Sequence, residues 1–207
     1  MTEYCRNLLV SGLEELCLPA DEKKINSLLA FIKLIEKWNK AYNLTAITKP
    51  ADMIRLHLLD SLSILKYLQG PNILDIGTGA GLPGIPLAVF CPEKCFVLLD
   101  SNAKKTRFVQ QAVLELRLEN VRIRHGRAEE YNSFKTFNSI ISRAFSDLQK
   151  FIEVSEHLLD KDGLLLAMKG RLPEDELEQI SWHYKVCPVN VPGIDIERCL
   201  LKLYKLG

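Results

Sequence analysis

The spacing of apolar residues changes once along the chain, near residue 70. Before this point, apolar side chains recur every three or four residues, the interval that lines one face of a helix. The first clear run follows Asp21, a residue suited to cap a helix N-terminus. Its apolar members are Ile25, Leu28, Leu29, Ile32, Leu34, Ile35 and Trp38. The pattern predicts a long amphipathic helix that ends in the turn-rich segment 39–50.

A second helix is predicted from Pro50, because proline is well accommodated in a first helical turn. The helix ends at Gly70 and Pro71, which break a helical pattern. Its apolar stripe is predicted to consist of Met53, Leu56, Leu59, Leu62 and Leu65. Residues 1–69 are therefore expected to be helical.

Beyond residue 71, short apolar runs of strand length alternate with helical segments. The strand-like runs are 72–77, 95–100, 120–126, 137–144 and 163–170, and helices are predicted from about Pro83, over 103–118 and over 148–159. Such alternation is typical of a parallel sheet with helices on both faces. The last runs, 184–193 and 198–206, have no helix between them and are predicted to pair antiparallel at one edge. We expect one structural unit, with a helical extension (1–69) packed on an α/β core (70–207).

Composition narrows the class of protein without identifying it. Of 207 residues, 47% are hydrophobic, and 27 basic side chains nearly balance 26 acidic ones. A polyanionic partner must therefore be met by a local basic surface. The N-terminal segment carries acids, and no apolar run approaches the length of a bilayer, so we expect a cytoplasmic protein with no membrane partner. Six scattered cysteines without a CxxC pair predict reduced thiols and no metal site.

The segment DIGTGAGLPGIP, residues 75–86, follows the first predicted strand and holds four glycines and two prolines. A loop at the C-terminal end of such a strand faces the ligand crevice of an open α/β sheet. Gly77, Gly79 and Gly81 lack a Cβ atom, so the chain can turn sharply and a ligand can approach the backbone. Asp100, at the end of the second strand, is placed to hold ribose hydroxyl groups.

Two cofactors satisfy parts of this pattern. Residues 79–84 have the G-x-G-x-x-G spacing of dinucleotide-binding loops. Residues 75–81 read acid-x-G-x-G-x-G, which suits S-adenosyl-L-methionine (SAM), whose methionyl end is cationic. A pyrophosphate needs free amides at the N-terminus of the next helix, but Pro83 and Pro86 supply none, and Asp75 would repel the diphosphate. The loop therefore favours SAM.

Further segments carry a family resemblance. They are KWNKAYNLT (37–45), HLLDS (57–61), DIGTGAGLPGIP (75–86), LLDS (98–101), Lys105 with Phe108, RAEE (127–130), ISRAF (141–145), MKG (168–170) and PEDE (173–176). Together they resemble the bacterial small-subunit ribosomal RNA guanine-N7 methyltransferases, also called the glucose-inhibited division protein B family. The resemblance runs in order through most of the chain. It implies a Rossmann-like class I SAM-dependent methyltransferase with a mostly parallel seven-stranded sheet.

The same resemblance implies an activity and a set of site residues. The activity is transfer of a methyl group from SAM to N7 of a guanine in 16S ribosomal RNA. The cofactor-binding residues expected from the loop and from the resemblance together are Gly77, Gly79, Leu82, Asp100, Ala128, Glu129 and Arg143. Among them, the resemblance implies that Ala128 and Glu129 meet the adenine and that Arg143 closes the site.

The chemistry of N7 methylation explains why no catalytic residue is assigned. Guanine N7 carries an unprotonated lone pair, so the reaction needs alignment and electrostatic matching rather than a general base. Arg143 cannot act as a base, and we expect it to orient the cofactor or the target base. The alternative for Arg143 is an ordinary ion pair.

Basic residues near the predicted strand ends are the candidates for RNA contact. Lys104, Lys105, Arg127 and Lys169 are expected to border the cofactor crevice, because the strand ends of a parallel sheet gather at one edge. Arg122 and Arg124 are expected to form a solvated face instead.

Two pairs of residues at helical spacing are given structural roles. His57 and Asp60 are expected to form hydrogen bonds from the helix to its surroundings, and Trp38 and Tyr42 are expected to pack on the core.

Two other functions remain open for the sequence alone. One is a methyltransferase acting on a small molecule, and the other is a non-enzymatic nucleotide-binding regulatory module. The favoured substrate is 16S ribosomal RNA in a ribosomal or assembly-intermediate context, since a nearly neutral chain attracts free RNA weakly. We expect a monomer.

Overall fold

The computed structural model describes residues 2–19, 21–143, 145 and 147–205. Ala144 of the ISRAF segment lies outside this part of the chain. The described residues form a seven-stranded sheet in the order β3-β2-β1-β4-β5-β7-β6. Its strands are β1 (Asn72–Ile76), β2 (Cys95–Asp100), β3 (Val121–His125), β4 (Phe137–Ser142), β5 (Leu159–Lys169), β6 (His183–Pro188) and β7 (Cys199–Tyr204). Strands β1 to β5 pair in parallel, whereas β7 pairs antiparallel with β5 and with β6, as the sequence predicts.

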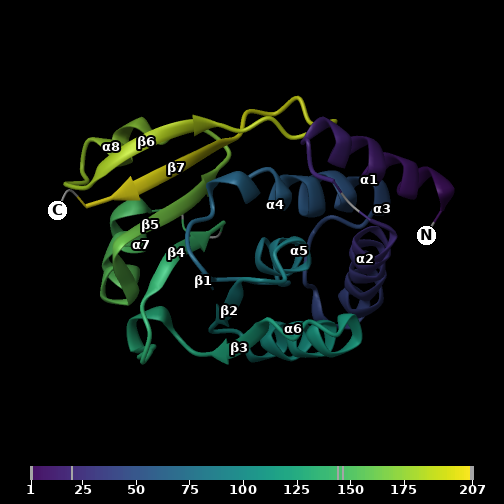
Figure 1. Ribbon diagram of the computed structural model, residues 1–207, viewed down its shortest axis with the longest axis horizontal. Coiled ribbons are helices and arrows are strands. Elements are labelled where there is room, and N and C mark those ends of the chain that lie inside the picture. The colour runs from purple at the N-terminus through teal and green to yellow at the C-terminus, as the bar shows by residue number, and fades with distance from the viewer. Residues whose placement is uncertain (1, 20, 144, 146, 206–207) are drawn as a thin grey trace.

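Helices cover both faces of the sheet (Figure 1). Between the parallel strands lie α5 (Gly84–Phe90), α6 (Ala103–Leu116) and α7 (Leu148–Ser155), which a 3-10 turn, η4 (Glu156–Leu158), extends. Alternate residues of each buried strand point to opposite faces. Ile73 of β1 therefore joins the apolar core beneath α5 and α6, while Leu74 joins the core beneath α7. Two more short helical segments are η3 (Ala128–Glu130) and α8 (Glu174–Leu177).

The N-terminal helices extend the larger of these two cores. They are α1 (Glu3–Glu15) and α2 (Glu22–Tyr42), and α2 packs on α5 and α6. Asp21 caps α2 as predicted, its Oδ1 accepting a hydrogen bond of 2.8 Å from the Lys24 amide. The Trp38 ring lies 5.0 Å from that of Tyr42 and 5.7 Å from that of Phe108, centre to centre. The prediction that Trp38 and Tyr42 pack on the core is therefore confirmed.

The segment from Pro50 is not the single helix that the sequence predicts. It divides into α3 (Pro50–Met53), a π-helical turn η1 (Ile54–Leu59), α4 (Asp60–Leu62) and a 3-10 turn η2 (Leu65–Tyr67). In the π turn the Asp60 amide donates to the carbonyl of Arg55, five residues back, so the apolar stripe shifts by one position. Leu56 is consequently partly buried, outside the core, and the prediction was wrong for this residue, whereas Leu65 is partly buried and packs against the core.

Parallel pairing brings the C-terminal ends of β1, β2, β4 and β5 to one edge of the sheet, and the antiparallel β7 begins at that edge. The glycine-rich loop follows β1 there, so the fold positions the predicted ligand site as expected. Within the described residues, no helix is long and apolar enough to span a membrane.

Candidate functional site

The glycine loop adopts a backbone that side chains disfavour. Gly77, Gly79 and Gly81 have φ angles of 70°, 59° and 79°, in the left-handed region where a Cβ atom causes strain. Among the described residues, a Cβ atom at Gly79 would meet only the Gly77 carbonyl oxygen, at 3.9 Å, so this part of the chain leaves the space beside Gly79 open. At Gly81 the space is filled by Ile85, at 2.6 Å. A ligand can therefore lie against the chain at Gly79, but not at Gly81.

Asp75, the last polar residue of β1, holds this loop together. Its Oδ2 accepts hydrogen bonds from the Thr78 hydroxyl at 2.7 Å and from the Gly84 amide at 2.9 Å. The side chain is fully buried, and Oδ1 has no hydrogen-bond partner among the described residues. Burial raises the pKa of Asp75 from its ordinary value of 3.8 to about 7. An unpartnered buried carboxylate oxygen is suited to accept from a cationic or N–H donor on a ligand.

The N-terminus of α5 has few amides left for a phosphate. The Gly84 amide donates to Asp75, the Ile85 amide donates to the Gly81 carbonyl, and Pro86 has no N–H. A pyrophosphate bound at a helix N-terminus relies on such amides. The structure therefore strengthens the argument against a dinucleotide.

Asp100, at the end of β2, faces the same loop. Its Oδ2 accepts from the Gly79 amide at 2.8 Å, and its Oδ1 accepts from the Asn102 amide at 2.8 Å. A carboxylate has about four acceptor positions, so each oxygen retains capacity for a hydroxyl group. These contacts tie the end of β2 to the glycine loop and fix the distance between them.

Three more residues expected to bind the cofactor follow β1 and β3. Ala128 is buried, and Glu129 is exposed and pairs with Lys150 at 3.3 Å. A hydrogen bond from its own amide, together with Lys150, lowers the pKa of Glu129. Leu82 is buried, and its amide donates to the Thr78 carbonyl at 2.8 Å. Leu82 therefore supports the loop from within the core.

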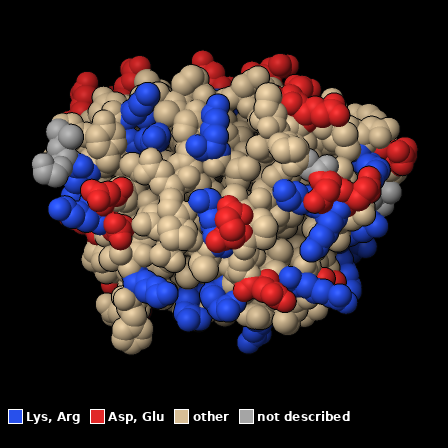
Figure 2. Space-filling view, viewed as in Figure 1, with Lys and Arg blue, Asp and Glu red and all other residues tan. Residues whose placement is uncertain are grey.

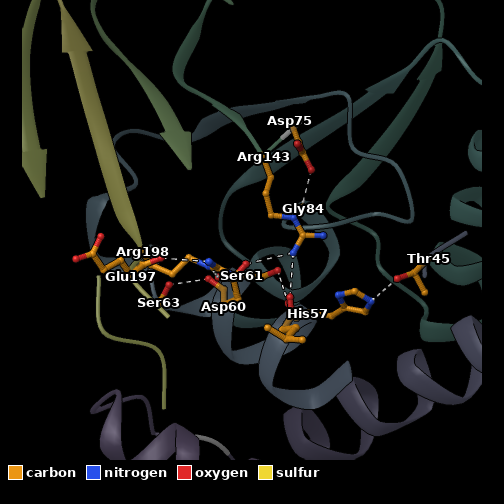
Figure 3. Close-up of polar contacts among 11 residues, drawn as sticks. Thr45, His57, Asp60, Ser61, Ser63, Asp75, Gly84, Arg143, Glu197 and Arg198 are labelled. Carbon is orange, nitrogen blue, oxygen red and sulfur yellow. Dashed lines mark hydrogen bonds and ion pairs between the residues drawn. The ribbon is translucent and has the colours of Figure 1, made fainter. Parts of the chain in front are cut away.

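Arg143, directly after β4, points away from the sheet to the π-helical segment (Figure 3). Its Nη1 donates to the Leu56 carbonyl at 3.2 Å and to Asp60 Oδ2 at 3.3 Å. The other carboxylate oxygen, Oδ1, accepts from Nε of Arg198 at 3.1 Å. Asp60 is only 4% exposed, so one buried carboxylate holds two guanidinium groups. The ion pair considered as the alternative for Arg143 is therefore present, and the helix-to-sheet hydrogen bond expected of Asp60 is confirmed.

His57 lies beside this cluster, on the π-helical turn η1 (Figure 3). Its Nε2 lies 3.0 Å from the Thr45 hydroxyl oxygen, and its buried Nδ1 has no hydrogen-bond partner among the described residues. Burial, followed by the charge of Arg143, lowers the pKa of His57 from 6.5 to about 4. The imidazole is therefore neutral at physiological pH.

The four basic residues predicted to meet RNA have different surroundings. Lys104 and Arg127 are exposed, and Lys105 is partly buried. The Lys169 side chain is only 10% exposed, and its Nζ lies 3.0 Å from Glu176 Oε2. Basic side chains gather along the lower edge of the face in Figure 2, where β3 and α6 lie. Arg122 and Arg124 are exposed, as predicted.

Sequence reasoning missed Arg198 and Thr45. Arg198 lies 138 residues from Asp60 along the chain, just before β7, and no local pattern links the two. Thr45 was present in the segment KWNKAYNLT, but its contact with His57 depends on the fold. Asp75 was found, but its role as the internal anchor of the glycine loop was not.

Comparison with known proteins gives matches over nearly the whole chain. A family model described as rRNA small subunit methyltransferase G matches residues 24–198. A ribosomal RNA small subunit methyltransferase G from Nitrosococcus oceani is 51% identical over 206 residues, which cover 98% of this chain and 96% of the relative. One from Stutzerimonas stutzeri is 46% identical over 200 residues, covering 94% and 93%.

Solved structures share the fold. A crystal structure of a SAM dependent methyltransferase from Aquifex aeolicus matches with a TM-score of 0.57 at 19% identity. The match covers 84% of this chain and 97% of that one. The α/β, Rossmann-like architecture expected from the sequence is thus confirmed.

Proposed function

The chain belongs to the rRNA small subunit methyltransferase G family, and we propose that it transfers a methyl group from SAM to N7 of a guanine in 16S ribosomal RNA. It is a SAM-dependent methyltransferase. The observation that carries the N7 proposal is that the two groups next to Arg143, His57 and Asp60, are poorly suited to remove a proton from a substrate. The pKa of His57 is lowered to about 4, so its imidazole is a weak base, and the Asp60 carboxylate is held by two arginines.

The residues at the carboxyl edge of the sheet fit SAM. The buried Oδ1 of Asp75, which has no partner in the described part of the chain, suits the methionyl ammonium group, and Asp100 suits the ribose hydroxyls. Open space beside Gly79 allows close approach to the backbone. Ala128 and Glu129 are proposed to meet the adenine. When bound, SAM supplies an electrophilic methyl group on a sulfonium.

The protein then has to position the target rather than activate it. Guanine N7 is an unprotonated nucleophile in the plane of the ring, so alignment with the methyl group is the main requirement. Arg143 lies after β4, and its position is fixed by Leu56 and Asp60. We assign it the role of orienting the cofactor or the guanine, since arginine cannot accept a proton at neutral pH.

The proposed partner is 16S ribosomal RNA in a ribosomal or assembly-intermediate context. Exposed Lys104 and Arg127, with Lys105, supply phosphate contacts near the site. Lys169 is also proposed to contact RNA. Its ammonium group pairs with Glu176, so an RNA phosphate has to share this group with Glu176 or displace the carboxylate. Residues 1–69 and 70–207 are proposed to act as one unit, as a monomer in the cytoplasm, where the substrate is found.

Methyl transfer to purified RNA tests the proposal. The full chain is incubated with SAM labelled in the methyl group, with either small subunits or deproteinised 16S RNA. The RNA is then treated with borohydride and aniline, which cleave at 7-methylguanosine. We expect label in RNA and cleavage at one guanine. Label at another atom would refute the N7 assignment, and the absence of RNA methylation would favour a small-molecule substrate. Tight NAD binding without any response to S-adenosylhomocysteine would favour a regulatory nucleotide-binding module.

A further inference from the structure

A cavity of about 490 Å³ lies beside Arg143, outside the glycine loop. It is formed by the segment 54–64, the end of β5 and the start of β7. These elements meet at the same edge of the sheet as the glycine loop, because β4 and β5 run parallel to β1. The volume falls within the range of about 300–1,000 Å³ that small-molecule sites occupy. The cavity is thus placed next to the cofactor site, on the side away from the adenine.

One part of the cavity wall is cationic. Arg143, Asp60 and Arg198 all line it. Two guanidinium groups share one carboxylate, so the cluster carries a net positive charge of one. The arginine side chains are 27% and 25% exposed, and a guanidinium has five N–H donors. Donors therefore remain for an anion, and the fork geometry of arginine matches a phosphate.

The rest of the wall is largely apolar. Its aliphatic side chains are those of Ile47, Leu56, Ile64, Met168, Val189 and Ile196. Such a lining suits the faces of a flat base, which lose their hydration on entry. The buried His57 adds an Nδ1 atom that is unpartnered within the described part of the chain. The polar edge of a base carries hydrogen-bonding groups that can pair with this nitrogen.

We infer that this cavity receives the target nucleotide and that Arg143 and Arg198, held together by Asp60, bind its phosphate. The inference rests on the proposed function, since it names the subsite of the same reaction. Asp60 acts as a positioning residue: it fixes two arginines from distant parts of the chain and does not touch the reacting atoms. The apolar wall holds the base with N7 toward the methyl donor.

Mononucleotide binding tests the phosphate contact directly. The full chain is saturated with S-adenosylhomocysteine, and guanosine and guanosine 5′-monophosphate are titrated calorimetrically. We expect the monophosphate to bind at least roughly tenfold more tightly, because its charged oxygens accept hydrogen bonds from the guanidinium groups. Equal affinities, no binding of the monophosphate, or its competition with S-adenosylhomocysteine would each overturn the inference.

Variants of Arg198 separate this inference from the proposed function. Arg198→Gln is expected to raise KM for RNA roughly tenfold, to leave KM for SAM unchanged and to reduce the preference for the monophosphate, since Arg143 remains. Arg198→Lys should restore part of the affinity, since it keeps the charge but not the fork. Arg124→Gln, an exposed arginine on β3, is the matched control. Thermal unfolding verifies that each variant is folded. If the wild-type chain methylates RNA but Arg198→Gln has an unchanged KM, the cavity assignment is wrong; if the wild-type chain does not methylate RNA, the proposed function is wrong.

Discussion

Replacing Asp75 with asparagine separates the structural role of this residue from its role in binding. The asparagine oxygen can still accept from the Thr78 hydroxyl and the Gly84 amide, so the anchor of the glycine loop is retained. What disappears is the negative charge and the unpartnered Oδ1. We therefore expect Asp75→Asn to fold, and to bind SAM and S-adenosylhomocysteine much more weakly, since both carry the methionyl ammonium group.

The pKa of Asp75 gives the expected size of the effect on stability. It is 3.8 for an ordinary aspartate and about 7 in the folded protein. Between these values the folded protein keeps a proton that the unfolded chain has released, so the free energy of unfolding falls as the pH rises. The loss amounts to about 4 kcal/mol by pH 8, because each pKa unit corresponds to about 1.36 kcal/mol. The Asp75→Asn variant has no carboxyl group at this position, so its free energy of unfolding does not fall for this reason.

Denaturant unfolding of the wild type and Asp75→Asn, at pH values from 4 to 8 and without cofactor, measures the difference. The stability of the variant relative to the wild type should rise by several kcal/mol over this range. Contributions of other groups, such as His57, are common to both proteins and cancel. With saturating S-adenosylhomocysteine the wild type should lose this pH dependence, because the ammonium group stabilises the carboxylate. Parallel stability curves without cofactor would refute the reasoning, and equal cofactor affinities would remove Asp75 from the binding site.

Three further substitutions test neighbouring features. Gly79→Ala places a Cβ atom in open space at a residue with a φ of 59°. Cofactor affinity, measured by calorimetry, should fall, while the free energy of unfolding should change by only about 1 kcal/mol. Unchanged affinity would contradict a ligand at this position. Gly84→Ala places a Cβ atom 2.2 Å from Leu98 Cδ2 and 2.8 Å from Asp75 Oδ2, so the unfolding free energy should fall by about 1–3 kcal/mol in denaturant, and a neutral result would contradict the packing. The pKa of His57 is lowered from 6.5 to about 4, so this residue contributes stability above pH 6.5 that is lost as the pH falls toward 4, about 3 kcal/mol in all. His57→Gln should flatten this part of the curve of unfolding free energy against pH. An unchanged slope would refute the burial of His57 as a neutral group.

Local patterns were sufficient to predict most of the fold. Alternation of strand-length and helical runs predicted the parallel strands, and the helix-free tail predicted the antiparallel pairing of β6 and β7. Asp21 was identified as a cap because capping depends on the residues next to it. The π turn at Ile54–Leu59 could not be predicted, since the residues of this segment are compatible with an α-helix and the turn accompanies contacts with Arg143.

The candidate site was predictable where it follows one strand and a glycine loop. Asp75 and Asp100 end neighbouring strands, so the sequence places them together. The cluster of Asp60, Arg143 and Arg198 was not predictable, because three distant segments meet there only after the sheet and the helical extension have packed. The sequence suggests that Lys169 is available to RNA. In the fold, α8 brings Glu176 to within 3.0 Å of its ammonium group, and no local pattern in the sequence predicts this contact.

The most direct test of the function is the methylation state of 16S ribosomal RNA in cells that lack this chain. Mass-spectrometric mapping of the RNA should show the loss of one N7-methylguanosine, restored by the wild-type chain and not by Gly79→Ala. A complete N7-methylguanosine pattern in cells without the chain would contradict the proposed function.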